Sequence, residues 1–159
     1  EHLLTQGLKL VKAYRRGQGF IFRNDDPRFE DFQDSFQERF KEMLSDPELR
    51  MINRNRGSGT RVLIDGLLGK HQPQGFLYEA KSHQAVAAAV AQSRADWGVA
   101  IRSVAEDQGL GFIPLQDEEY DFIIPESRLQ KPAVQALIGL LDEKPIIERL
   151  EQMGLIRNP

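Results

Sequence analysis

Residues 50–65, RMINRNRGSGTRVLID, constrain the fold more than any other part of the chain. They predict a short strand over 50–53, a glycine loop, and a helix from about Thr60 to Leu68 that ends at Gly69. The first N–H groups of such a helix have no partner within it, and they lie at the positive end of the helix dipole. This segment therefore predicts a site that attracts anions.

Side chains in the loop support the same prediction. Ser58 and Thr60 add hydroxyl donors, and Arg54, Arg56 and Arg61 add positive charge. The loop lacks the Gly-x-x-x-x-Gly-Lys spacing of a P-loop, and it lacks the third glycine of a dinucleotide-binding fingerprint. The alternative is a tight strand-to-helix turn that merely needs glycine.

Composition limits the function classes that fit this chain. Its 159 residues, 40% hydrophobic and 28% charged, suffice for one globular domain with a real core. The net charge of −3 argues against a general nucleic-acid binder. Because the chain has no cysteine, disulfides and thiolate metal sites are excluded.

Neither a membrane partner nor secretion is expected from the sequence. No apolar run approaches the length of a membrane-spanning helix. The first residues, 1–4, lack the charged and apolar regions of a signal peptide. We therefore expect a cytoplasmic location in preference to a periplasmic one.

Strand-like and helix-like segments alternate along the chain, which predicts an α/β fold. The strands are expected at 8–14, 19–22, 50–53, 75–79, 96–101, 111–115 and 119–124, with a turn at 15–19. The helices are expected at 27–44, 60–68, 83–95, 102–108, 132–141 and 145–153. The phenylalanines of 27–44 recur every three or four residues, which predicts a face packed in the core.

Two further helix starts follow predicted strands. Ser82 is a typical N-cap, so the N–H groups at Ser82, His83 and Gln84 form a second candidate anion site. Arg102 follows the strand that ends at Ile101 and opens a third helix. In α/β sheets such helix starts meet at one edge. The alternatives are plain capping by Ser82, an exposed first-turn His83 without a role, and a solvated Arg102.

The sequence predicts neither a catalytic constellation nor a metal site. The three histidines, His2, His71 and His83, are far apart and lack metal-ligand spacing. No Ser-His-Asp arrangement stands out. Gln18 and the arginines beside it belong to the predicted turn, where solvent exposure is expected and a place in a cleft is the alternative. We therefore expect a protein that is not an enzyme.

Several segments together resemble a known family. They are NRNRGSGTRVLID at 53–65, SHQAVAAAVA at 82–91, ADWGVAI at 95–101, FIPL at 112–115 and YDFIIP at 120–125. In order and spacing they resemble periplasmic-binding-protein-like domains of type II that are related to molybdate-binding proteins. Such domains are found attached to helix-turn-helix DNA-binding domains or to MoeA-type molybdopterin-biosynthesis proteins.

The resemblance implies an α/β fold with a three-layer type II lobe and part of a second one. It places a single domain over 1–159, in which about 14–118 form the second lobe. Residues 1–13 and 119–159 would supply hinge strands and part of the first lobe. Because most of that first lobe is missing, this piece alone is expected to bind ligand weakly or not at all.

The resemblance also implies a ligand, an oxyanion such as molybdate or tungstate, and no other cofactor. Ile101 stands where dedicated molybdate-binding proteins often have a tyrosine. The residues expected near the ligand are Arg56, Gly57, Ser58, Gly59, Thr60, Arg61, Ser82, His83, Gln84, Ile101 and Arg102.

The function expected from the sequence is oxyanion binding or sensing within a larger protein. Its partners would be a small inorganic oxyanion and a fused upstream domain, either DNA-binding or for molybdopterin biosynthesis, with homodimerisation as a further expectation. One alternative is an effector domain for a small organic anion, as in LysR-type regulators. Others are an enzyme acting on a phosphorylated substrate, with His83 as its base, and a non-binding remnant used for dimerisation.

Overall fold

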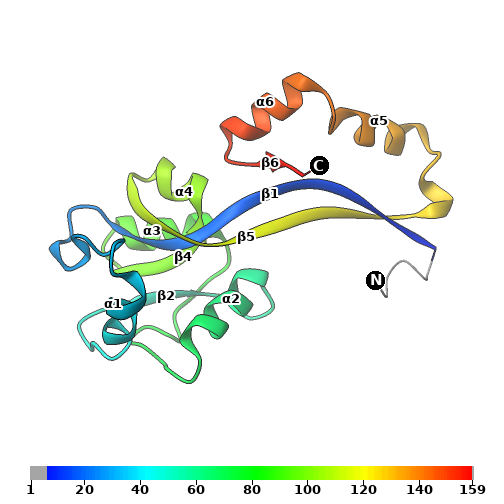
Figure 1. Cartoon of the computed structure of the whole chain (residues 1–159). Coiled ribbons are helices and arrows are strands. Elements are labelled where there is room, and N and C mark those ends of the chain that lie inside the picture. Colours follow the sequence, from blue (N-terminus) through cyan, green and yellow to red (C-terminus); the bar gives the residue numbers. More distant parts are fainter. Residues whose placement is uncertain (1–6, 159) are drawn as a thin grey trace. The chain divides into compact units, whose positions relative to one another are not determined.

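The computed structural model describes residues 7–158, which form two compact units (Figure 1). Unit 2 comprises residues 18–116, and unit 1 comprises the chain on either side, up to Gly17 and from Asp117. The long strands β1 (Leu8–Arg23) and β5 (Leu110–Pro125) each contribute residues to both units. The assignment of these units to the lobes of a binding protein stays a prediction, and residues 1–6 of the expected first-lobe segment lie outside the described part.

Unit 2 is built on a mixed sheet. Strand β2 (Met51–Arg54) pairs in parallel with β3 (Glu79–Ala80) on one side and with β4 (Trp97–Ile101) on the other. The β1 segment runs antiparallel to β4, with Gln18 opposite Ile101. The β5 segment follows β1 in the sheet order. The end at which β2, β3 and β4 finish is called here the carboxyl edge.

Helices cover both faces of this sheet and give unit 2 three layers (Figure 1). On one face, α1 (Phe36–Met43), α2 (Gly59–Leu68) and the short η2 (Pro27–Phe29) pack around Phe20 and Trp97. On the other, α3 (His83–Ala91) and α4 (Arg102–Asp107) pack alanine and valine side chains against the sheet. The predicted α/β fold class is confirmed.

Unit 1 combines segments of the two long strands with short helices and a short third strand. Its β1 and β5 segments lead through η3 (Glu126–Arg128) to α5 (Pro132–Leu140), α6 (Lys144–Gln152) and β6 (Ile156–Arg157). Strand β6 pairs with β1 in antiparallel orientation. Neither α5 nor α6 has a buried residue. Within residues 7–158 no helix has both the length and the apolar character needed to cross a bilayer.

Two predicted breaks in the strands are wrong. The expected turn at 15–19 is extended backbone within β1, and the expected gap between 115 and 119 lies within β5. Gly19 is needed here for close approach rather than for a turn, because a Cβ at this position would clash with the Phe112 ring and the Ile113 carbonyl. A glycine-rich run therefore belongs to a strand where another strand packs closely against it.

Two other predicted elements are shorter than expected. The helix expected over 27–44 is η2, then turns that include Asp31 at a φ of 53°, then α1. The strand expected over 75–79 is mostly a turn, in which Gly75 has a φ of 87° and lies against the Met51 backbone. At 27–44 the packing of aromatic rings overrides the helical periodicity of the sequence. At 75–79 the close approach of Gly75 to the Met51 backbone overrides the strand pattern.

Candidate functional site

Helix α2 begins at the carboxyl edge with an N-cap serine. The Ser58 hydroxyl accepts a hydrogen bond from the Arg61 N–H at 3.2 Å and donates to the Asn55 carbonyl at 3.0 Å. Its hydrogen-bonding capacity is thus largely used by the loop itself. The N–H groups of Gly59 and Thr60 have no acceptor within the helix, so they are the donors that α2 offers to a ligand.

Helix α3, which follows the next strand β3 along the chain, begins in the same way. The Ser82 hydroxyl accepts from the Ala85 N–H at 3.1 Å, and Gln84 is exposed. His83 is not the exposed first-turn residue that we considered from the sequence. It is 8% exposed, and its ring lies 3.1 Å from the Arg54 guanidinium.

Arg54 contributes to the site although it was not among the residues expected near the ligand and was counted only as positive charge of the loop. It is the last residue of β2 and is 7% exposed. Its Nη1 lies 3.4 Å from the Thr60 hydroxyl in addition to its contact with His83. A positive charge is therefore buried at the carboxyl edge, between the starts of α2 and α3. Side chains alternate along β2, so Arg54 shares a face with the partly buried Ile52, whereas Met51 and Asn53 occupy the other face.

Arg61 is directed into the protein and has two acidic partners. Its guanidinium donates to Asp65 at 2.7 Å and to Glu79 at 2.9 Å. Desolvation lowers the pKa of Arg61, but the hydrogen bonds that its guanidinium donates to these two carboxylates outweigh this effect, and the pKa is raised overall. With its charge balanced in this way, Arg61 supports the loop and adds little net attraction for an anion.

The third predicted helix start, at α4, differs from the other two. Ile101 is its N-cap residue, is 8% exposed and makes no side-chain cap bond. The exposed Arg102 lies over the Phe112 ring at 4.4 Å and 3.8 Å from Glu106. The Arg102 side chain is therefore held by residues of its own helix and of β5. At the carboxyl edge α4 presents only its backbone N–H groups.

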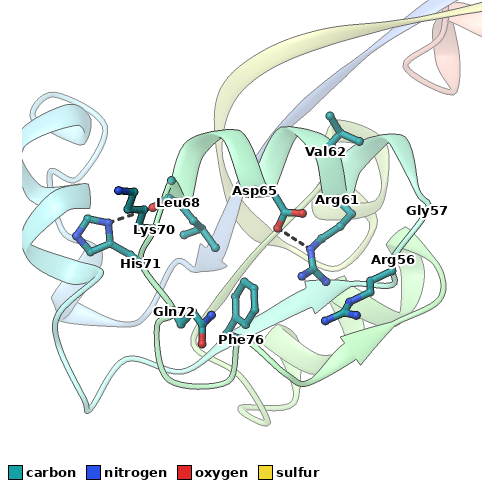
Figure 2. A pocket seen from close by; sticks show the side chains of 11 residues that line it. Arg56, Gly57, Arg61, Val62, Asp65, Leu68, Lys70, His71, Gln72 and Phe76 are labelled. Atoms are coloured by element: carbon teal, nitrogen blue, oxygen red, sulfur yellow. Dashed lines mark hydrogen bonds and ion pairs between the residues drawn. The ribbon is translucent and has the colours of Figure 1, made fainter.

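A pocket of about 600 Å³ runs along the flank of α2 (Figure 2). Three predicted residues, Arg56, Gly57 and Arg61, line it, and the Arg61 guanidinium lies 4.9 Å from the Phe76 ring centroid. Its other lining residues are Val62, Asp65, Leu68, Gly69, Lys70, His71, Gln72 and Phe76. The residues that the sequence placed together near one ligand thus lie in two places. Arg56 and Arg61 line this pocket, whereas the N–H groups without an acceptor belong to the helix starts at the carboxyl edge.

The described part of the chain contains no cluster of three or more His, Asp or Glu side chains that could hold a metal ion. The functional groups at the carboxyl edge are therefore the helix N-termini, the Ser58, Thr60 and Ser82 hydroxyls, and the buried Arg54–His83 pair. Chemically, such a set can attract negative charge, since N–H dipoles and a guanidinium all favour it.

Comparison with known proteins agrees with this architecture. The model of the PBP superfamily domain matches residues 1–142, so the chain belongs to the PBP (periplasmic-binding-protein-like) superfamily.

Two curated relatives are uncharacterised proteins. One is YvgK of Bacillus subtilis (strain 168), with 34% identity over 113 residues, 67% of this chain and 37% of YvgK. The other is a protein encoded in the 5′ region of a ferredoxin gene of Clostridium pasteurianum, with 31% identity over 81 residues, 50% of this chain and 72% of that protein. The chain thus spans little more than a third of the length of YvgK.

Solved structures share the fold at low sequence identity. One is described as a phosphate transporter substrate-binding protein with bound phosphate, from Clostridium perfringens, with a TM-score of 0.69 and 15% identity. That match covers 98% of this chain and 74% of the other. A phosphate transport receptor from Vibrio cholerae matches with a TM-score of 0.61 and 14% identity, over 96% and 74% of the two chains. At these identities the likeness establishes the fold alone.

Proposed function

We infer that this chain is a ligand-binding domain that holds a small oxyanion at the carboxyl edge of unit 2. The observation that carries the proposal is that β2, β3 and β4 run parallel and are followed by α2, α3 and α4. Their helix N-termini therefore lie at one edge. The proposal gives the chain a binding role and no catalytic one, in keeping with its superfamily.

Charge burial at the edge supports an anionic ligand. Arg54 is buried beside the start of α2, so an approaching anion meets a guanidinium shielded from water as well as N–H dipoles. Electrostatic attraction is stronger where water is excluded. The structurally similar phosphate-binding proteins supply a precedent for this ligand class.

Finer points of the function rest on the sequence resemblance alone. Molybdate or tungstate as ligand, a sensing role beside a DNA-binding or molybdopterin-biosynthesis domain, a homodimer and a cytoplasmic location all belong to this proposal. In such a protein, ligand binding would shift the population of conformations and so signal to the attached module.

Isothermal titration calorimetry on the chain tests anion binding directly. Phosphate, sulfate, molybdate, tungstate and a set of small carboxylates would be titrated separately. Weak binding of an inorganic oxyanion, measured at high ligand concentration, is the expected result, in line with the weak binding that the sequence resemblance implies for this piece. Heat with carboxylates only would favour an organic-anion effector domain, and no heat with any of them would overturn the proposal for this chain.

A charge variant locates the site. Gly59→Asp places a carboxylate in the first turn of α2, where an acidic residue favours the helix but repels an anionic ligand. We expect at least about tenfold weaker oxyanion binding, equivalent to about 1.4 kcal/mol, without loss of thermal stability. Gly66→Asp is the matched control, since it adds the same charge at an exposed position of α2 with no atoms near its Cβ. Equal effects of the two variants would contradict the location.

A further inference from the structure

A pocket of about 770 Å³ lies near the C-terminal end of α2, away from the helix start that carries the candidate anion site. Its lining comes from α1, from the end of α2 with residues 69–71, and from residues 114 and 115 of β5. All of these segments belong to unit 2. The volume falls within the range of about 300–1,000 Å³ that is usual for small-molecule sites. We call it the α1–α2 pocket.

The α1–α2 pocket opens onto the edge of the aromatic core. Three of its lining residues belong to the core cluster, and three more are partly buried against that cluster. In that order they are Phe40, Leu44, Leu68, Phe36, Leu67 and Leu115. The Phe36 and Phe40 rings are stacked, with centroids 5.2 Å apart. Apolar surface is thus open to solvent in a concave place, and such a patch with a polar rim is characteristic of a binding site.

The charged side chains that line the pocket are all basic. Lys41 lies in the last turn of α1 and Lys70 follows the C-cap of α2, and both are exposed. Within residues 7–158 neither lysine forms an ion pair. Glu38 and Glu42 of α1 lie outside the lining, and no other described Asp or Glu belongs to it. The pocket therefore attracts an anionic group and repels a cationic one.

Hydrogen bonds hold the segment after α2 in place. The Gly69 N–H donates to the Asp65 carbonyl, and the His71 N–H donates to the Leu68 carbonyl, each at 3.0 Å. The His71 ring also lies with its Nδ1 3.0 Å from the Leu68 carbonyl oxygen (Figure 2). The backbone at Lys70 is therefore ordered before a ligand binds, which reduces the entropic cost of binding.

We propose that the α1–α2 pocket binds a small amphipathic carboxylate. The apolar body of this ligand packs on the Phe36 and Phe40 rings. Its carboxylate lies at the rim, beside Lys41 and Lys70. A bare oxyanion would leave the apolar lining uncovered, and a neutral hydrocarbon would gain nothing from the lysines. A ligand that carries both an apolar body and a negative charge uses the whole lining.

The α1–α2 pocket is separate from the candidate anion site. Helix α2 begins at Gly59 with the anion site and ends at Leu68, which lines the pocket. At about 1.5 Å per residue, the ten residues of α2 extend over about 15 Å. The proposal therefore goes beyond oxyanion binding and does not depend on it.

Amide chemical shifts of the isotope-labelled chain test the proposal. Octanoate and octylammonium, which have the same number of carbon atoms and opposite charge, would be titrated separately. We expect the shifts caused by octanoate to cluster at residues 36–44 and 66–71. Octanoate should bind at least about fivefold more tightly than octylammonium. Because the net charge of the chain is −3 and favours the cation overall, this preference reports the local charge of the pocket.

A glycine variant blocks the pocket. Gly66 lines it, and no atom lies within 4 Å of a Cβ added at this residue. Gly66→Phe therefore occupies pocket space without a clash and should weaken octanoate binding at least about tenfold. Gly139→Phe is the matched control, since Gly139 is likewise an exposed helical glycine with open space around its Cβ. It should leave octanoate binding within about twofold, and melting temperatures check the folding of both variants.

A double lysine variant tests the charge. Lys41→Gln with Lys70→Gln should bring the affinities for octanoate and octylammonium to within about twofold of each other. Lys131→Gln with Lys144→Gln is the control, because it removes the same charge from exposed residues of unit 1. This control should keep the preference for octanoate.

The outcomes separate this proposal from oxyanion binding. No octanoate binding, shifts that spare residues 36–44 and 66–71, or equal binding of the two amphiphiles by the unmodified chain would each overturn it. Shifts at the same residues that grow with protein concentration alone would identify a second copy of the chain as the occupant and would also overturn it. Octanoate binding as expected, without any phosphate binding, would overturn only the proposed oxyanion function.

Discussion

Different interactions stabilise the interior of each of the two units. Unit 2 buries an aromatic cluster in which Phe20 contacts six other rings, at centroid distances from 5.2 to 6.1 Å. In unit 1 polar and aromatic pairs join β1 to β5, among them Lys12 with Glu119 and Tyr14 stacked on Tyr120. Buried apolar packing contributes far more stability than half-exposed pairs. Unit 2 is therefore the stable part of the chain, and it carries the whole candidate site.

The largest expected effect comes from emptying the aromatic core of unit 2. Phe20→Ala should lower the free energy of unfolding by about 3–5 kcal/mol, because the side chain is fully buried. Phe122→Ala in unit 1, where the ring is 37% exposed, should cost less than about 1.5 kcal/mol. Urea denaturation measures both. Similar losses would contradict the contrast between the units.

A glycine comparison gives the next largest effect. Gly75 in unit 2 has a positive φ, and a Cβ there would meet the Met51 carbonyl, so Gly75→Ala should cost up to about 3 kcal/mol. Gly7 in unit 1 has a φ of 68° but open space around it, so Gly7→Ala should cost about 1 kcal/mol. Thermal unfolding measures the loss of stability in both variants. The loss at Gly75 combines backbone strain with a steric clash, whereas the loss at Gly7 comes from backbone strain alone. A cost at Gly75 no larger than that at Gly7 would refute the clash.

Acid should weaken unit 2 through a network of arginines and aspartates. Hydrogen bonds from Arg28 hold the pKa of Asp26 below its ordinary 3.8, against desolvation. Desolvation raises the pKa of Asp96, but hydrogen bonds from the Arg50 N–H and from Arg28, at 2.8 and 2.6 Å, lower it overall. Because both pKa values are lower in the folded state, this stabilisation is complete well above pH 3.8 and is lost as the pH falls through the folded values.

The variant Asp96→Asn tests that network. It should cost about 2 kcal/mol at pH 7, and the unfolding free energy should then depend less on pH below about 5. Asp107→Asn, at an exposed residue of α4, is the control and should change neither quantity. An unchanged acid dependence in Asp96→Asn would assign the effect to other carboxylates.

The smallest expected effect lies in the ion pairs of unit 1. Arg15 and Asp117 are 3.8 Å apart, with side chains 49% and 62% exposed. Asp117→Asn should change stability by less than about 0.5 kcal/mol, and raising the salt concentration should abolish even that difference. A loss above about 1 kcal/mol that persists in high salt would show that unit 1 depends on its charges more than the exposure indicates.

Local signals explain which parts were predictable. The starts of α2 and α3 follow from Ser58 and Ser82, whose capping bonds involve residues only three positions away. The aromatic face of 27–44 was correctly expected in the core, but its helix was not, because Phe29 and Phe32 pack on Phe20 from turns. The buried state of Arg54 and of Gln18 depends on neighbouring strands, which one segment of sequence does not reveal.

The sequence by itself determined the α/β class and the glycine loop with its helix start, since both depend on contacts within a few residues, and it carries the prediction of an anion site at these N–H groups. The tertiary structure decided that β1 and β5 are unbroken, that Arg61 is paired with Asp65 and Glu79, and that Arg54 and Gln18 are buried at the carboxyl edge. The physical reason is that burial and pairing depend on segments far apart in the chain.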